Sequence, residues 1–257
     1  MQNKTTIEGY RLSPQQSQIW RVQQSGQSAR CAVLIEGQLN VKSLRLAIEK
    51  VIERHEILRT TFQRIAGMDT PLQVINESSR LGLCEYELSH LDAEHQQARL
   101  EILFQQLDQS FDLEESPTLQ TAFVTLSPFK HVLLFAVPSL CADRVSFENL
   151  TSEISRTYAA CMRGEVVEDE TVQYADVSGI LNDLLESEDT KAGREYWQKY
   201  AGHESFEVHL PFLQESNVSE RFNPQVVSVA IGSEVANKLD ELTREFETTN
   251  FNFTLAC

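Results

Sequence analysis

The chain has 257 residues and is 41% hydrophobic, which is enough to bury a sizeable core in one large domain or two small ones. Its formal net charge of −16 disfavours nucleic acids and anionic membrane surfaces as partners, because both are polyanions that bind basic patches. No run approaches the roughly 18 apolar residues of a membrane span, and the first residues do not resemble a secretion signal. We therefore expect a cytoplasmic protein.

The first part of the chain carries strand signals on either side of a helix signal. Residues 30–37 are rich in apolar and β-branched side chains and stop at a glycine, which predicts a strand. Asn40 is placed to cap a helix, because the apolar residues after it recur at helical spacing. Those apolar positions are Leu44, Ile48, Val51 and Ile52. Further short strands are predicted at residues 59–65, 72–75 and 83–88.

Two helices and a hairpin are predicted next. Asp92 is placed to cap a helix with an apolar stripe formed by Leu100, Leu103, Phe104, Leu107 and Phe111. Residues 119–126 alternate in hydrophobicity, and a short turn joins them to residues 131–137, which are continuously apolar like a strand covered on both faces. Helical spacing returns from Ser146 to about Met162. Together these signals predict an α/β fold with α+β layering, in which helices cover a mixed β-sheet.

The character of the chain changes after Gly164. Residues 165–189 hold nine carboxylates and no lysine or arginine. Such a run is typical of a solvated face or linker, and a docking surface for a basic partner is the alternative. Beyond it we expect a helix at residues 192–202, a strand at 225–231, a helix capped by Ser233, and the start of an apolar helix in the last seven residues. The predicted organisation is a lobe at 1–164, an acidic linker with connecting helices at 165–220, and the beginning of a second lobe at 221–257.

The sequence lacks the common catalytic motifs. It contains no G-x-G-x-x-G, P-loop, H-E-x-x-H or G-x-S-x-G pattern. The five cysteines lie far apart without a C-x-x-C pair, so we expect small buried side chains and neither a metal site nor a disulfide framework. They are Cys31, Cys84, Cys141, Cys161 and Cys257.

Three side chains are nevertheless candidates for chemistry. His55 is the histidine best placed for a general base, although its position at the end of an amphipathic helix favours a structural role. Cys141 is a poor candidate nucleophile, because the neighbouring carboxylate of Asp143 raises the pKa of a thiol. Ser139 is a candidate nucleophile only if a histidine lies beside it in the fold.

Three stretches carry a family resemblance. They are "YRLSPQQSQIW" (10–20), "ERHEILRTTF" (53–62) and "VQYADVSGILNDLLESEDTKAGREYWQKYAG" (172–202). In this order they resemble the successive motifs of condensation domains of nonribosomal peptide synthetases, over nearly the whole chain. The resemblance implies a fold similar to chloramphenicol acetyltransferase, with two lobes in a V around a tunnel.

The resemblance also implies a reaction. In the family, phosphopantetheine arms on carrier proteins bring a donor thioester and an acceptor amine into the tunnel, and the second histidine of an H-H-x-x-x-D-G motif assists the attack. Two tethered substrates meet at high effective concentration, and one imidazole handles the proton near neutral pH. The resemblance implies no directly bound cofactor and no metal, and it leaves the substrate-binding residues unknown.

This chain departs from the family motif at the positions of the two histidines and of the glycine. Aligned through "LLFAV", the two histidines fall on Pro138 and Ser139, the aspartate on Asp143 and the glycine on Arg144. We name residues 138–144 the motif turn. A proline has no ionisable group, and a serine hydroxyl cannot replace imidazole as a base near pH 7. The long side chain of Arg144 is expected to narrow the tunnel.

The motif aspartate is the part of the pattern that this chain keeps. The resemblance gives Asp143 an architectural role, in an ion pair with Arg59. One-sided loss of such a buried pair costs roughly 3–5 kcal/mol. We therefore expect Asp143 and Arg59 to be structural residues.

The expected function is a condensation-like domain without peptide-bond activity. It would act as a structural or recruiting platform for a carrier protein, neighbouring synthetase domains or a tailoring enzyme, within a longer synthetase. The alternative is an active acyl or aminoacyl transferase with an altered turn, in which Ser139 orients substrate. A third possibility is a small-molecule-binding protein outside any synthetase.

Overall fold

The structure, a computed structural model, describes residues 9–22, 28–77, 81–107, 111–115, 119–165, 167, 171–201 and 227–256. The chain divides into two compact units, Met1–Pro211 and Phe212–Cys257. None of the described helices has the length and apolar character needed to cross a membrane.

A four-stranded mixed sheet forms the centre of the first unit. Its order is β2–β7–β6–β5, with β7 antiparallel to both neighbours and β5 parallel to β6. The strands are β2 (Ser28–Glu36), β5 (Gly82–Glu87), β6 (Gln120–Ser127) and β7 (Lys130–Pro138). The predicted mixed sheet and the hairpin between β6 and β7 are confirmed.

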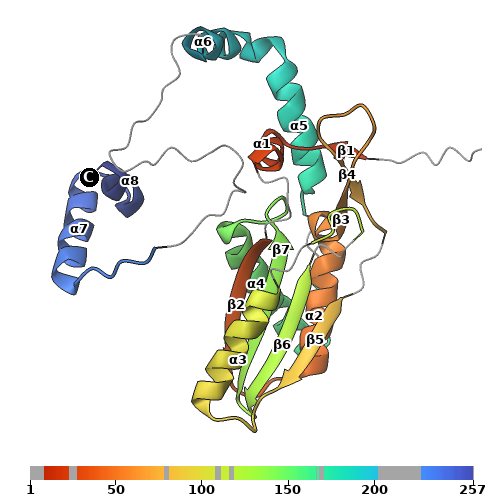
Figure 1. Cartoon of the computed structure of the whole chain (residues 1–257), viewed down its shortest axis with the longest axis vertical. Coiled ribbons are helices and arrows are strands. Elements are labelled where there is room, and N and C mark those ends of the chain that lie inside the picture. Colours follow the sequence, from red (N-terminus) through yellow and green to blue (C-terminus); the bar gives the residue numbers. More distant parts are fainter. Residues whose placement is uncertain are drawn as a thin grey trace, which may run out of the picture. The chain divides into compact units, whose positions relative to one another are not determined.

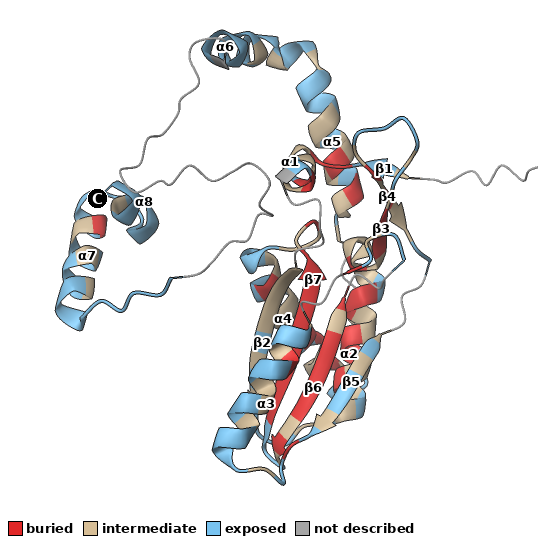
Figure 2. Cartoon of the chain, viewed as in Figure 1, coloured by how far each residue is buried: buried red, intermediate tan, exposed pale blue. Residues whose placement is uncertain are grey.

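Helices cover both faces of this sheet (Figure 1). On one face α2 (Val41–Arg54) and α4 (Arg144–Arg163) pack on Phe123, Leu133 and Phe135. On the other face α3 (Ala93–Gln106) packs on strand residues of the opposite parity, among them Val124 and Leu134. Strands β6 and β7 are therefore buried along most of their length (Figure 2), which explains the continuous apolar run of β7.

A smaller antiparallel sheet lies beside the motif turn. Its order is β1–β4–β3. The elements of this region are β1 (Tyr10–Arg11), α1 (Pro14–Val22), the 3-10 helix η1 (Glu56–Arg59), β3 (Thr60–Gln63) and β4 (Leu72–Ile75).

Most local predictions hold, with three exceptions in the first unit. Asn40 and Asp92 cap α2 and α3 as expected, each accepting a hydrogen bond of 3.0 Å from a backbone N–H three residues on. Phe111 lies beyond the end of α3, and α4 begins two residues before the predicted Ser146. The cysteines are less buried than predicted, since Cys84 is exposed on the edge strand β5 and Cys31, Cys141 and Cys161 are half-buried, while Cys257 lies outside the described residues.

The acidic stretch is helical over much of its length. It contains α5 (Tyr174–Glu186) and the 3-10 helix η2 (Glu188–Thr190), and α6 (Lys191–Ala201) follows. Ala175 and Ser178 on α5 are buried, and α5 packs against β1 and η1. Part of the segment predicted as a linker is therefore built into the first unit.

The described part of the second unit holds two helices, α7 (Ser233–Glu245) and α8 (Asn250–Ala256). The predicted final helix is confirmed by α8. The strand predicted at 225–231 is wrong for its described residues 227–231, because none of the described strands pairs with them. The Ser233 cap is also wrong, since Gly232 takes the capping position without a side-chain hydrogen bond.

Candidate functional site

The motif turn connects the central strand to α4. Pro138 is buried at the end of β7, where it pairs with Ser28 of β2. The chain then reverses, and the Cys141 N–H donates to the Pro138 carbonyl over 2.7 Å. Ser139 is half-buried in this turn. The four motif positions therefore extend from the last residue of β7, through a short loop, to the first residue of α4.

Asp143 caps α4. Its Oδ1 accepts from the backbone N–H of Ser146 over 2.8 Å and from the Ser146 hydroxyl over 2.7 Å. The Ser146 Oγ in turn accepts from the Asp143 N–H over 3.2 Å, which completes a capping box. These bonds with Ser146 hold the pKa of the exposed Asp143 carboxyl below its usual value.

The ion pair expected between Asp143 and Arg59 is wrong. Arg59 donates to the Asn76 carbonyl over 2.5 Å and pairs with the Glu56 carboxylate at 3.3 Å. Both partners of Arg59 come from η1 and the end of β4, whereas the Asp143 carboxylate is directed at the first turn of its own helix. Asp143 is a structural residue in this chain, but through helix capping.

This difference gives a stability prediction for Asp143. Asp143→Ala is expected to lower the free energy of unfolding of the first unit by about 1 kcal/mol, the usual value of an N-cap. Asp143→Asn should cost much less, because asparagine caps equally well. Urea unfolding followed by tryptophan fluorescence reports on the first unit, which contains both tryptophans. A loss of about 3–5 kcal/mol in both variants would instead indicate a buried ion pair.

The turn holds no activated nucleophile among the described residues. None of the four described histidines shares a hydrogen bond with Ser139, so a serine–histidine pair is not formed there. Burial raises the pKa of the Cys141 thiol far above its ordinary value. Burial, and not the neighbouring Asp143, therefore makes the Cys141 thiol a poor candidate nucleophile.

His55 belongs to a charged cluster behind the turn. Its Nε2 lies 2.7 Å from Oε2 of Glu153, and Arg54 bonds the other oxygen of the same carboxylate. The cluster joins the end of α2 to the middle of α4. Beside it lies a cavity of about 310 Å³, lined by His55 and Glu153 and by Cys141 and Ala142 of the turn. A carboxylate that bonds both Arg54 and His55 and joins two helices favours the structural role of His55.

Arg144 does not line this cavity. Its side chain is 91% exposed and pairs with Glu148 at 3.2 Å. It borders a groove of about 960 Å³ between β2 and α4. The narrowing of a tunnel by Arg144 stays a prediction.

Sequence reasoning missed three polar residues around the turn. Glu153 has no local signature, since its partner His55 lies 98 residues away. Gln16 and Gln73 are buried and bond each other. A signal for Gln16 exists in "SPQQ", because Ser13 and Gln16 have the S-x-x-Q spacing of a capping box. No three histidine, cysteine or acidic side chains of the described segments come together as a metal site.

The layered sheet, its helices and the turn at the end of β7 define a lobe of the condensation type. The Condensation domain family model matches residues 7–257, and the chain belongs to this family. Tyrocidine synthase 3 of Brevibacillus parabrevis is 28% identical over 225 residues, which are 88% of this chain and 3% of that protein. Surfactin synthase subunit 2 of Bacillus subtilis (strain 168) is 27% identical over 84% of this chain and 6% of that protein.

Solved structures share the fold. The X-domain from teicoplanin biosynthesis matches with a TM-score of 0.77 at 24% identity, over 95% of this chain and 55% of that one. The condensation domain of the monacolin K polyketide synthase MokA matches with a TM-score of 0.74 at 23% identity, over 97% and 58%. An X-domain in complex with OxyB matches with a TM-score of 0.65 at 26% identity, over 80% and 46%. The chain spans about half the length of these solved chains.

Proposed function

We propose that this chain is part of a condensation-type domain that does not form peptide bonds and that recruits other proteins of a nonribosomal peptide synthetase. The observation that carries the proposal is the motif turn. Its two histidine positions are a buried proline and a serine without an imidazole partner among the described residues. A turn of this kind has no group that titrates near neutral pH to accept the proton of an attacking amine.

The partners follow from the family context. A carrier protein would bring its own phosphopantetheine arm, and the residues of this chain that would contact the arm are not assigned. Residues 221–257 would begin the second lobe, and the protein would work in the cytoplasm.

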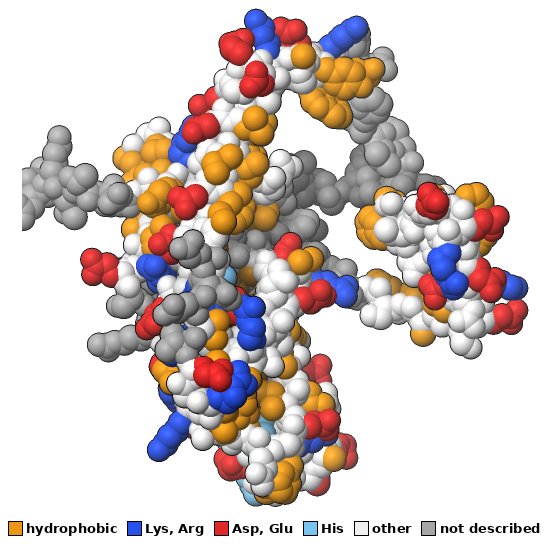
Figure 3. Space-filling model, turned by 180° about the vertical axis from the view of Figure 1, so that it is seen from behind, with side chains coloured by type: hydrophobic (Ala, Val, Ile, Leu, Met, Phe, Trp, Pro, Cys, Tyr) orange, Lys and Arg blue, Asp and Glu red, His pale blue; other side chains and the backbone are white. Residues whose placement is uncertain are grey.

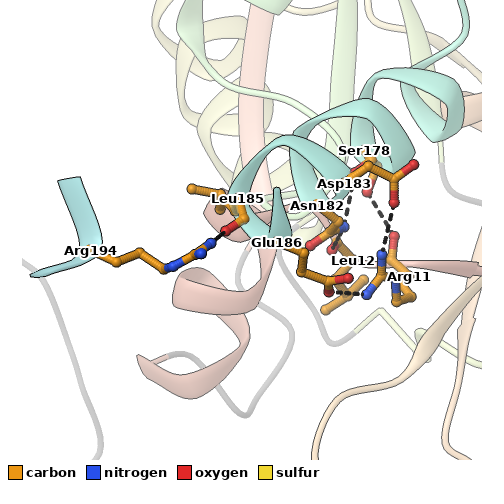
Figure 4. A network of polar contacts seen from close by, with 8 residues as sticks. All are labelled: Arg11, Leu12, Ser178, Asn182, Asp183, Leu185, Glu186 and Arg194. Carbon is orange, nitrogen blue, oxygen red and sulfur yellow. Dashed lines mark hydrogen bonds and ion pairs between the residues drawn. The ribbon is translucent and has the colours of Figure 1, made fainter. Parts of the chain in front are cut away.

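The recruiting surface that we favour is α5, because it is firmly held on the first unit (Figure 4). Ser178 Oγ donates to the Arg11 carbonyl over 2.7 Å, and Asn182 donates to the Leu12 carbonyl over 2.9 Å. The Arg11 guanidinium pairs with Glu186 at 2.5 Å and Asp183 at 3.3 Å. A helix held at several points along its length presents its outer face with little ordering cost on binding.

The outer face of α5 combines apolar and acidic groups (Figure 3). Asp176, Ile180 and Leu184 follow one another at a spacing of four residues on this face, and all three are exposed. Apolar side chains beside an acidic group suit a protein that offers apolar side chains within a basic face. A tailoring enzyme with such a face fits better than a carrier protein, which is commonly acidic. The solved complex of an X-domain with OxyB gives a precedent for recruitment in this family.

This surface is tested by measuring the affinity of the chain for tailoring enzymes that are encoded beside its gene. The double substitution Ile180→Ser and Leu184→Ser is expected to weaken the complex about tenfold or more, as loss of central apolar contacts does. Higher salt should weaken it further by screening the acidic groups of α5. The matched control is Ile102→Ser on α3, an exposed isoleucine away from α5. Calorimetry that finds equal affinity for the α5 variant and the unmodified chain would reject α5 as the surface.

A further inference from the structure

Two buried glutamines lie between the motif turn and α5. Gln16 on α1 and Gln73 on β4 are 2% and 1% exposed. The Gln16 Nε2 donates to the Gln73 Oε1 over 3.0 Å and to the Leu140 carbonyl of the turn over 2.9 Å. The Gln73 Nε2 donates to the Arg11 carbonyl over 2.9 Å.

Every side-chain donor and acceptor of this pair has a hydrogen-bond partner. The Gln16 Oε1 accepts from the Ser13 N–H over 2.9 Å, so both amide protons and the amide oxygen of Gln16 have partners. Exchanging the oxygen and nitrogen of Gln16 would turn its NH2 toward the Ser13 N–H and its oxygen toward the Leu140 carbonyl. Both contacts would be repulsive, so the surroundings allow one orientation. Buried amides that are fully satisfied in one orientation specify a single arrangement of the backbone around them.

The contact to Leu140 fixes the turn itself. Leu140 lies between Pro138 and Cys141, whose backbone groups close the turn. Asp143, which the family pattern makes the brace, is exposed and bonds within the first turn of α4. Among the described residues, the side-chain hydrogen bond that reaches the turn from outside its own loop therefore comes from Gln16.

The same pair reaches α5. The Gln73 Nε2 lies 3.5 Å from the Ser178 Oγ, and both groups donate to the Arg11 carbonyl. Ser178 is 0% exposed. One polar network thus runs from the motif turn through two amides to the helix that we propose as the recruiting surface.

We infer that Gln16 is the positioning residue of the motif turn, in place of an Asp143–Arg59 ion pair, and that Gln73 extends this brace to α5. The turn keeps a fixed conformation although it lacks the two histidines of the family motif. This inference holds whether or not the domain is catalytically active.

Amide hydrogen exchange by NMR, residue by residue, tests the brace in the 257-residue chain. Gln16→Met is expected to speed exchange of the Cys141 N–H about tenfold or more, because a lost buried hydrogen bond shifts a local opening equilibrium by roughly this factor. Asp143→Ala should leave that N–H unchanged and affect only the first turn of α4. The matched control is Gln96→Met, since Gln96 also donates to two backbone carbonyls, those of Leu88 and Leu126, far from the turn.

The unmodified chain gives a second readout that needs no variant. Both side-chain NH2 groups of Gln16 and Gln73 should exchange far more slowly than those of exposed glutamines. Gln73→Met should speed exchange at the buried start of α5 more than at Cys141. Fast exchange of the Gln16 NH2, or a Cys141 N–H that responds to Asp143→Ala and not to Gln16→Met, would overturn the inference.

Discussion

Replacing Glu153 by alanine is expected to lower the free energy of unfolding of the first unit by about 3–5 kcal/mol, because it leaves the largely buried Arg54 guanidinium unpaired and removes the hydrogen-bond partner of His55. The side chains of Glu153 and Arg54 are 15% and 11% exposed, and that of His55 is 25% exposed. One carboxylate bonds both neighbours. Urea unfolding followed by tryptophan fluorescence measures the loss.

Glu148→Ala is the matched control on the same helix. Glu148 also pairs with an arginine, but both side chains are largely exposed, so the expected cost is below about 1 kcal/mol. Equal losses in the two variants would contradict a special role for the buried cluster.

The cluster also makes the free energy of unfolding depend on pH, through the Glu153 carboxyl. Burial alone would raise the pKa of Glu153, but hydrogen bonds from His55 and Arg54, with their charges, outweigh it and hold this pKa below its ordinary value. A carboxyl whose pKa is lower in the folded state stabilises the fold above its unfolded pKa of about 4.3, and this stabilisation is lost as pH falls through the folded value. The difference in unfolding free energy between the unmodified chain and Glu153→Gln should therefore shrink below about pH 4.

Phe135→Ala is the second substitution with a large expected effect. Phe135 is 0% exposed at the centre of β7, between Cys31 of β2 and Thr121 of β6. Removing a ring from a close-packed site loses its transfer free energy and leaves a cavity, together about 3–5 kcal/mol. Urea unfolding of the first unit measures this loss.

Phe129→Ala is the matched control, because it removes the same side chain from an exposed position. Phe129 lies at the β6–β7 hairpin and is 57% exposed, so its loss should change stability by about 0.5 kcal/mol or less. A Phe135→Ala variant as stable as Phe129→Ala would contradict the two-faced core described for β7.

Local patterns allowed much of the fold to be predicted. The apolar run of β7, the hairpin before it, and the caps at Asn40 and Asp92 depend on residues close in sequence, and each is present. The strand predicted at 225–231 shows the limit of this reasoning, because β propensity needs a paired neighbour.

The site was less predictable, because its contacts join distant parts of the chain. The motif alignment located the turn, but the partner of Arg59 is Glu56 and that of Asp143 is Ser146. The brace from Gln16 to Leu140 spans 124 residues, and no local pattern carries it. Side-chain partners at this separation are set by packing of whole elements.

The most direct test of the proposed function is a condensation assay on the protein as the cell produces it, with a carrier-bound donor thioester and an acceptor amine. We expect no product above the uncatalysed rate, and no difference between the unmodified protein and Ser139→Ala. An active condensation domain assayed with the same carriers confirms that the substrates are competent. Turnover above the uncatalysed rate that is abolished by Ser139→Ala would contradict the account and identify an acyltransferase with an altered turn.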